Sequence, residues 1–442
     1  MAESAAAPQP RANANGRPVG LSLVLEGAFG FRVLAAIVVQ WFTRREGALC
    51  VFPDTRIYWH LARMIRAGAP FEVVEWGDLP RFALRTPGYP LFLAACQLVF
   101  GARVLPVRLV QAALGTWCVW LVARLTAQVI GDEASRRRIG TVPLVAALLA
   151  VFEPYFVVTA ALVLSEAVFI PLMLASLWGL AVLWPGAGAG PPRHDGPWAL
   201  ATGLASGAAV LVRPSWAPCV PALLLAWIVL SGRGRRAGAC KGALLVGLGA
   251  VLVMAPWWVR NARIYGRFIP TALWAGASLY DGLNPRATGA SDMDGFMAAP
   301  DIWPLDEEVQ DAELRRRALA FARAHPGRAL GLAAIKLARF WSPWPNIARF
   351  RSPMDNLAGA AVTVPLYVLL AQGAWDRRRD ARALVLLAGP LAYFCALHMV
   401  FASSMRYRIP AAIPALGLAA IGARRLFGNS KWGRCQMTDD KG

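Results

Sequence analysis

Long apolar stretches constrain this chain most, because about 20 apolar residues are what an α-helix needs to cross the hydrocarbon core of a membrane. The 442-residue chain is 57 % hydrophobic and only 16 % charged, whereas soluble domains are about 45–50 % apolar and about 25 % charged. The sequence therefore predicts an all-α polytopic membrane protein with about ten transmembrane helices. These apolar stretches are residues 21–43, 105–130, 141–164, 166–184, 197–212, 214–231, 242–259, 357–373, 383–401 and 409–423.

The basic residues indicate how the chain is oriented. A net charge of +20 would suggest a nucleic-acid partner in a soluble protein. Here the Lys and Arg residues gather in short connectors between apolar stretches, and such loops stay on the cytoplasmic side, so we expect no nucleic-acid partner. With the N-terminus inside, ten spans put every basic connector on the cytoplasmic face, namely 132–138, 232–241, 376–382 and the tail 424–434.

Two long segments, 44–104 and 260–356, then face outward. Each contains an apolar piece of about 13–14 residues, which is too short to span the membrane, so we expect both pieces to lie on its surface as interfacial helices. Counting either as a span would move a basic connector outside, but whether they cross stays open. The pieces are 89–101 and 329–342, and the predicted organisation is one transmembrane domain, 21–424, between a disordered cytoplasmic tail, 1–20, and a second cytoplasmic tail, 425–442.

Cysteine and histidine spacing offers no metal site and no disulfide framework. The seven cysteines are scattered, mostly in apolar stretches and without a CxxC pair, and the four histidines are equally dispersed. We interpret the cysteines as small buried hydrophobic residues. No glycine-rich nucleotide-binding loop follows a strand pattern either. No metal or other cofactor is predicted, although metal dependence stays open.

The outward segments bring acids and arginines together at the height of lipid headgroups. Asp54 opens the first segment and Arg85 follows it, while the last outer loop, "SSMRYRIP", carries Arg406 and Arg408. An enzyme that moves a sugar from a lipid phosphate needs a carboxylate as general base and cations that stabilise the departing phosphate. Arginine suits phosphate through its planar fork of donors. This pattern therefore favours a glycosyl transfer at the membrane surface.

An ordered set of motifs along almost the whole chain resembles the bacterial family 39-type glycosyltransferases. These are integral-membrane GT-C enzymes similar to the protein O-mannosyltransferases and the lipid A aminoarabinose transferase. The chain departs from the family at Thr86, where a proline is usual, and at Leu283 and Arg286, where the family has an asparagine and an acid. The motifs are "PDTRIYWHLARMIRAGAPF", "RTPGYPLFLA", "VLSEAVFIPLMLA", "GLASGAAVLVRPSW", "APWWVRNARIYGRFIP", "LYDGLNPRATG" and "RYRIPAAIPAL".

The resemblance implies a GT-C fold and gives roles to particular residues. Asp54 becomes the catalytic carboxylate, a general base on a juxtamembrane helix, and Arg85, Arg406 and Arg408 become the residues that bind the donor phosphate. Seven further residues are candidates for the active-site cavity: Tyr58, Glu75, Asp78, Glu166, Arg260, Tyr280 and Asn284.

Several of these residues also fit a purely structural role. Asp54 precedes a helical run and is a preferred helix N-cap. Glu166 is a candidate for a buried ion pair with an arginine, and Arg85 for an arginine that reaches toward the interface. Glu75 and Asp78 fit solvated loop acids equally well. The apolar stripe behind Asp54 is expected to lie on the membrane and hold the acid at headgroup height.

The function predicted from these features is an inverting transfer of a sugar from a polyprenyl-phosphate donor to an acceptor on the outer face of the membrane. The acceptor class, whether glycan, lipid or protein, stays open, and membrane lipids are the surrounding partners. We expect a multi-pass protein of the inner (plasma) membrane. The alternative is a polytopic transporter or lipid flippase, which would be expected to show internal repeats.

Overall fold

The computed structural model describes residues 19–45, 52–74, 79–130, 139–186, 196–292, 300–346 and 352–427. Within these residues the regular structure is helical, apart from one antiparallel bridge between Val73 and Arg81. The predicted all-α fold class is confirmed.

Among the described residues, six helical segments are long and apolar enough to cross a membrane. Two further pairs of helices form one span each if their bends are allowed, which gives up to eight spans. The six are α1 (Val19–Arg45), α4 (Val104–Ile130), α8 (Glu166–Leu183), α11 (Arg236–Tyr265), α16 (Pro353–Asp376) and the run α17 (Ala381–Ala383), η4 (Leu384–Ala388) and α18 (Gly389–Val400).

The bent pairs are α6 (Thr141–Phe152) with α7 (Pro154–Ala161), at 59°, and α19 (Met405–Ala412) with α20 (Leu416–Phe427), at 73°. Two predicted spans correspond to shorter apolar helices, α9 (Gly196–Val212) and α10 (Cys219–Leu230) with its preceding turn η1 (Pro214–Trp216). Every predicted apolar stretch therefore coincides with helix, while the count of ten spans stays a prediction.

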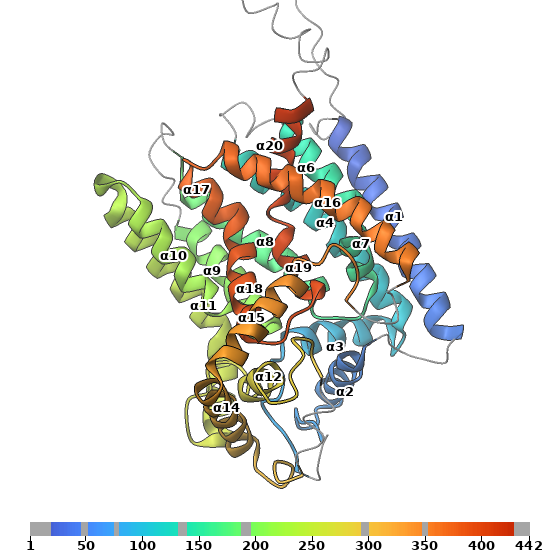
Figure 1. Ribbon diagram of the computed structural model, residues 1–442, viewed down its shortest axis with the longest axis vertical. Coiled ribbons are helices and arrows are strands. Elements are labelled where there is room, and N and C mark those ends of the chain that lie inside the picture. Colours follow the sequence, from blue (N-terminus) through green and yellow to red (C-terminus); the bar gives the residue numbers. More distant parts are fainter. Residues whose placement is uncertain are drawn as a thin grey trace, which may run out of the picture.

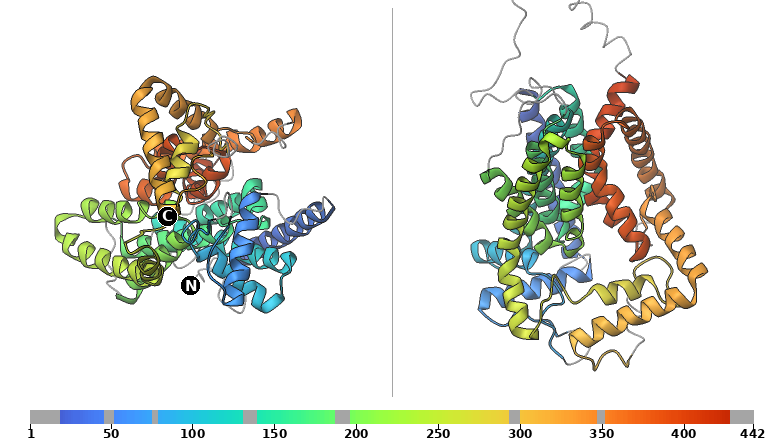
Figure 2. Two further views of the ribbon diagram at one scale, coloured as in Figure 1. Left: turned by 90° about the horizontal axis from the view of Figure 1, so that it is seen from below. Right: turned by 90° about the vertical axis from the view of Figure 1, so that its left-hand side faces the viewer.

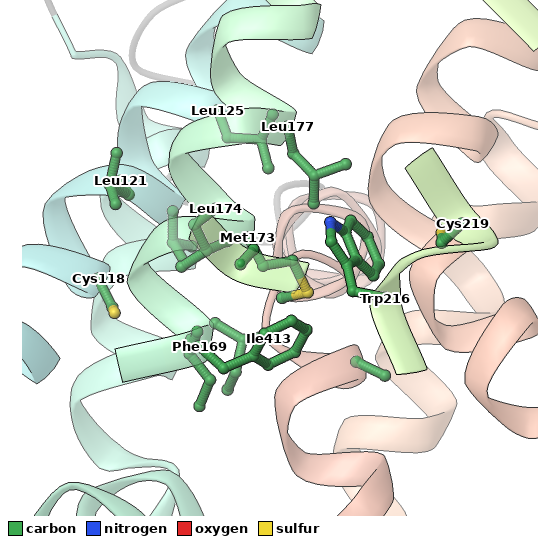
Figure 3. Packing of buried hydrophobic residues seen from close by; sticks show 14 of the residues in the cluster. Cys118, Leu121, Leu125, Phe169, Met173, Leu174, Leu177, Trp216, Cys219 and Ile413 are labelled. Carbon is green, nitrogen blue, oxygen red and sulfur yellow. The ribbon is translucent and has the colours of Figure 1, made fainter. Parts of the chain in front are cut away.

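Helix α8 lies at the centre of the bundle. It packs against α4 and α9, and Figure 3 shows its Leu174 and Leu177 between Leu125 of α4 and Trp216. Most of α8 is buried, whereas α1 and α16 bury little of their apolar length. A helix that is hydrophobic all round belongs in an interior, and the outward apolar faces of α1 and α16 are suited to lipid.

Glycines allow α9 and α11 to approach closely. A Cβ atom at Gly203 of α9 would collide with the carbonyl oxygen of Val246 on α11, and one at Gly249 of α11 would collide with Leu200 on α9. Small residues at such crossings are typical of membrane helices, where close backbone packing replaces a hydrophobic driving force. The α9–α11 pair is thereby held against the central α8.

The two predicted outward segments form one end of the molecule (Figures 1 and 2). Helix α1 begins, and α20 ends, at the opposite end (Figure 1). The apolar pieces 89–101 and 329–342 fall on α3 and α15. α3 has 13 residues, about 20 Å at 1.5 Å per residue, and is too short to span. The helices of this end are α2 (Pro53–Ala67), α3 (Gly88–Phe100), α12 (Ala275–Gly282), α14 (Glu307–Ala324) and α15 (Pro326–Phe340).

The prediction that the apolar stripe of α2, formed by Ile57, Leu61 and Ile65, lies on the membrane is wrong. Ile57 and Leu61 are buried in a small cluster with Val73 and Leu84, against which Trp274 packs. The bridge at Val73 folds the chain back beneath α2, so the stripe is covered by protein. Helix α2 is therefore held by the outer segments themselves.

Candidate active site

Helix α2 presents Asp54 in its first turn. The helix starts at Pro53, a residue suited to the first helical position, and stops at Gly68, which adopts the left-handed conformation at φ 65°. Its N-cap is Phe52 without a side-chain hydrogen bond, so the capping role considered for Asp54 is wrong. The Thr55 hydroxyl donates to the Val163 carbonyl oxygen at 2.8 Å and fixes the start of α2 against the break between α7 and α8.

Both carboxylate oxygens of Asp54 face arginines. Arg85 Nη2 lies 3.5 Å from Oδ1, and Arg406 Nη1 lies 3.2 Å from Oδ2. Each guanidinium also lies over an aromatic ring, that of Arg85 4.7 Å from the Trp274 centroid and that of Arg406 4.9 Å from the Phe52 centroid. Cation–π contacts of this kind orient a guanidinium without using its donors. The arginines therefore keep donor capacity beside Asp54.

Arg406 also binds the second acid, Glu166, at the first residue of α8. Its Nε lies 2.6 Å from Glu166 Oε1, and Arg213 Nη1 lies 3.1 Å from the same oxygen. The Glu166 side chain is buried, and a helix N-terminus favours a carboxylate. The structure shows the ion pair considered for Glu166, and Arg406 connects that pair to Asp54, while the place of Glu166 in an active-site cavity stays a prediction.

The cluster carries more positive than negative charge. Three guanidinium groups, those of Arg85, Arg213 and Arg406, face the two carboxylates of Asp54 and Glu166. One positive charge is left in excess, which suits an additional anion. The Asp54 side chain is 35 % exposed and the Glu166 side chain 1 % exposed. Asp54 is therefore the carboxylate that a substrate can reach, and Glu166 the one that holds Arg406.

Tyr58, a predicted cavity residue, lies near Arg85 and the two acids. Its ring meets Tyr89 edge to face with centroids 5.1 Å apart. Burial raises the pKa of the Tyr58 hydroxyl, while the nearby Arg85 acts in the opposite direction, and Ser165 hydrogen-bonds to it. The hydroxyl stays protonated at neutral pH and is a hydrogen-bond donor beside the two acids.

Arg408 lies outside the cluster, although it was grouped with Arg406 at the phosphate. It donates to the carbonyl oxygens of Phe340 at 2.8 Å and Ser342 at 2.7 Å, and lies over the Tyr367 ring. Residues two apart on a helix differ by about 200° around its axis, so one faces the acids of the site while the other faces the end of α15. The sequence motif alone does not separate them.

Arg260 binds the backbone of the first outer segment and does not contact the two acids among the described residues. Its two terminal nitrogens donate to the carbonyl oxygens of Phe71 and Phe82, both at 2.8 Å. The Asn284 amide is used within its own turn, donating to the Tyr280 carbonyl at 2.8 Å and accepting from the Arg286 N–H at 2.8 Å.

Tyr280 packs against the hydrophobic cluster around α14. Within the part of the chain that the structure describes, no hydrogen bond or ion pair joins Tyr280 or Asn284 to the two acids. Glu75 and Asp78 lie outside the described residues.

Glu307 was not predicted, yet it holds the segment that carries Arg85. Its carboxylate accepts from the N–H groups of Phe82 at 2.8 Å and Ala83 at 3.1 Å and from the Tyr265 hydroxyl. The available signal was the helical spacing of α14, in which one buried face mixes acids with apolar residues. That face consists of Glu307, Gln310, Asp311, Leu314 and Ala318.

Among the described residues, no three His, Cys, Asp or Glu side chains converge as metal ligands would. The polar groups of the cluster are instead those of an anion site with a carboxylate at its edge.

Comparison with known proteins gives a family match over part of the chain and a shared fold. Residues 84–259 match the family described as "Dolichyl-phosphate-mannose-protein mannosyltransferase", a range that holds Arg85, Glu166 and Arg213 but not Asp54 or Arg406. None of the curated proteins compared with the chain matches its sequence significantly.

Solved structures of the oligosaccharyltransferase AglB from Archaeoglobus fulgidus share the fold. A complex with an inhibitory peptide and a dolichol-phosphate superposes with a TM-score of 0.57 at 14 % identity, over 95 % of this chain and 52 % of AglB. The apo form gives 0.58 at 13 % identity, over 97 % and 53 %. This chain thus spans about half the length of AglB. ArnT from Cupriavidus metallidurans, bound to undecaprenyl phosphate, matches more loosely, with a TM-score of 0.40 at 16 % identity over 89 % of this chain and 77 % of that one. The chain is thus similar over residues 84–259 to this mannosyltransferase family, and it shares the fold of AglB.

Proposed function

We propose that this protein transfers a sugar from a polyprenyl-phosphate donor to an acceptor hydroxyl or amine, with inversion at the anomeric carbon. The observation that carries the proposal is the reachable carboxylate of Asp54, whose two oxygens contact Arg85 and Arg406. A general base and the cations for a leaving phosphate are thereby adjacent, as a single displacement requires.

The reaction proceeds in one step. Asp54 removes the proton from the acceptor, and the acceptor oxygen or nitrogen attacks the anomeric carbon of the donor sugar. The bond between that carbon and the phosphate oxygen breaks, and its electron pair leaves with the polyprenyl phosphate. Asp54 ends protonated, and the sugar is attached with inverted configuration.

Arg85 and Arg406 stabilise the charge that develops on the departing phosphate. Arginine binds phosphate through parallel N–H groups, and stabilisation of this kind is a large part of catalysis. The phosphate also draws the guanidinium groups from Asp54, which leaves its carboxylate free to accept the acceptor proton. The dolichol-phosphate in AglB, a protein of the same fold, supports a lipid phosphate here.

The reaction is assigned to the outer face of the inner membrane. The supporting observation is the charge pattern, because α2 and α14 lie at one end of the molecule (Figure 1), whereas 232–241 and 376–382 are basic connectors of the kind retained in the cytoplasm. Arg408, which donates to backbone carbonyls, is proposed to position α19 rather than to bind phosphate.

The proposal is tested with purified protein in lipid nanodiscs, a panel of radiolabelled polyprenyl-phosphate sugars and a cell-envelope extract as acceptor. Label should move from the organic-soluble donor into the extract with wild-type protein and not with Asp54→Asn. An equal transfer rate in Asp54→Asn excludes the mechanism. A transporter would instead move the labelled lipid between leaflets with either protein and form no product.

A further inference from the structure

The backbone of Phe82 and Ala83, which lead to Arg85, is hydrogen-bonded to the second outer segment. On one side the Glu307 carboxylate accepts from the N–H groups of Phe82 and Ala83. On the other side the Phe82 carbonyl accepts from Arg260 at 2.8 Å, and the Ala83 carbonyl accepts from the Leu273 N–H at 2.9 Å. The backbone polar groups of both residues are thereby paired with residues about 180–225 positions away in sequence.

The Arg85 side chain also contacts the second outer segment. Its guanidinium lies over Trp274, the residue that follows Leu273 and precedes α12. The same segment thus pairs with the backbone before Arg85 and supplies the ring beneath its side chain. Nothing in this arrangement requires a contact between Glu307 and a substrate.

Glu307 is the charged centre of the arrangement. It is buried, 6 % exposed, and a carboxylate that accepts backbone N–H groups in such a site makes strong, directional bonds. Arg81 and Arg260 face it electrostatically, and the Tyr265 hydroxyl at the end of α11 donates to it. Losing its charge would loosen the segment without removing any side chain of the cluster around Asp54.

We infer that Glu307 is a positioning residue for Arg85, through which the second outer segment sets the affinity for the donor's lipid phosphate. The inference rests on the proposed function, because it takes Arg85 to bind that phosphate. Glu307 acts on donor binding and not on proton transfer by Asp54.

The first measurement is the Kd of polyprenyl phosphate without sugar, titrated into the full-length protein in nanodiscs. Glu307→Gln keeps the shape of the side chain and should weaken binding about tenfold, the effect of roughly 1.4 kcal/mol. Tyr265→Phe, which removes one donor to Glu307, should weaken it less. Glu308→Gln is the matched control, since Glu308 is on the same helix turn and pairs only with the exposed Arg267 among the described residues; its Kd should equal that of wild type.

The double variant Arg85→Ala/Glu307→Gln separates positioning from general damage. If Glu307 acts through Arg85, the double variant should bind no more weakly than Arg85→Ala alone, because effects in one chain of contacts are not additive. Additive losses would overturn the inference. If Arg85→Ala alone leaves the Kd unchanged, the proposed phosphate site fails, and this result is distinct from failure of the Glu307 inference.

The pH dependence gives a second readout that a merely structural role would not move. Burial raises the pKa of Glu307, while its hydrogen bonds with Tyr265 and the two N–H groups and the charge of Arg81 act in the opposite direction. On acidification the wild-type carboxyl takes up a proton at a higher pH than an exposed glutamate and loses part of its acceptor capacity. The Kd of wild type should therefore rise with falling pH more steeply than that of Glu307→Gln, and identical profiles would overturn the inference.

Discussion

The two ends of α8 are both bound by arginine, in different ways. At its first residue Arg406 and Arg213 meet the carboxylate of Glu166. Near its last residue Arg382 donates instead to backbone carbonyls, to Ala181 at 2.8 Å on α8 and to Val129 at 3.1 Å on α4. The two ends of this 18-residue helix lie about 27 Å apart. Arginine binds a carboxylate at one end and backbone carbonyls at the other.

The difference distinguishes an arginine available to a ligand from one committed to the fold. The last carbonyls of a helix lack intrahelical partners, and a cation at that end also complements the helix dipole. Arg382 therefore caps the C-terminal ends of α4 and α8. An arginine between two carboxylates can instead exchange one anion for another. The residue type therefore does not reveal the role, whereas the partner does.

The largest expected effect is at the reachable acid. Asp54→Asn should lower turnover about 10²–10⁴-fold, the usual worth of a general base, because the amide cannot accept a proton. The Kd of the donor should change little. Asp376→Asn, which alters an exposed acid at the other end of the molecule, is the control. Turnover within twofold of wild type in Asp54→Asn would show that Asp54 is not the general base. The contrast between a catalytic end and a structural end of α8 would then be lost.

The next effect concerns stability at the other end of α8. Arg382→Met should destabilise the protein by at least about 1.5–3 kcal/mol, the worth of one hydrogen bond to a charged group, since several carbonyls lose their donor. The Tm in detergent should fall, while donor Kd of the folded fraction stays at the wild-type value. Arg378→Met, in the same connector but exposed, should leave the Tm unchanged. A loss of donor affinity in Arg382→Met would contradict the division of roles.

Arg85→Ala should act mainly on donor binding. Removing a charge-assisted contact worth about 1.5–3 kcal/mol should raise the donor Kd roughly 10–100-fold. Turnover at saturating donor should fall much less than in Asp54→Asn. Arg85→Lys should lie between, because an ammonium group lacks the planar fork. A Kd equal to that of wild type would shift the phosphate site toward Arg406.

The smallest change in donor binding is expected at Arg408, which can be compared with Arg406 on the same helix, α19. Arg408→Ala should leave the donor Kd within about twofold of wild type and lower the Tm, because Arg408 binds carbonyls at the end of α15 with contacts of about 1.5–3 kcal/mol. Arg406→Ala should weaken donor binding, and it should also lower the Tm because the buried Glu166 keeps only Arg213 as a partner. Equal losses of affinity in both variants would return Arg408 to the phosphate site.

The helices could be predicted from sequence because span length and apolar content are local properties. The pairing of Asp54, Arg85 and Arg406 also agrees with the residues singled out from the motifs. Three features could not be predicted from the local sequence. The direction in which Arg408 faces depends on the rotation of α19, the covered face of α2 depends on a chain reversal near Val73, and the contact of Glu307 with Ala83 joins residues 224 positions apart.

The charged cluster draws on five separate stretches of chain, and its contact between Asp54 and Arg406 closes across 352 positions. During synthesis, Glu166 and Arg213 are made long before Arg406, so until then the buried carboxylate has only one of its two arginine partners. The site is therefore complete only after α19 has been made and inserted. A chain stopped before residue 405 would contain Asp54, Arg85 and most of the bundle, yet lack the arginine that contacts both acids, and would therefore be inactive.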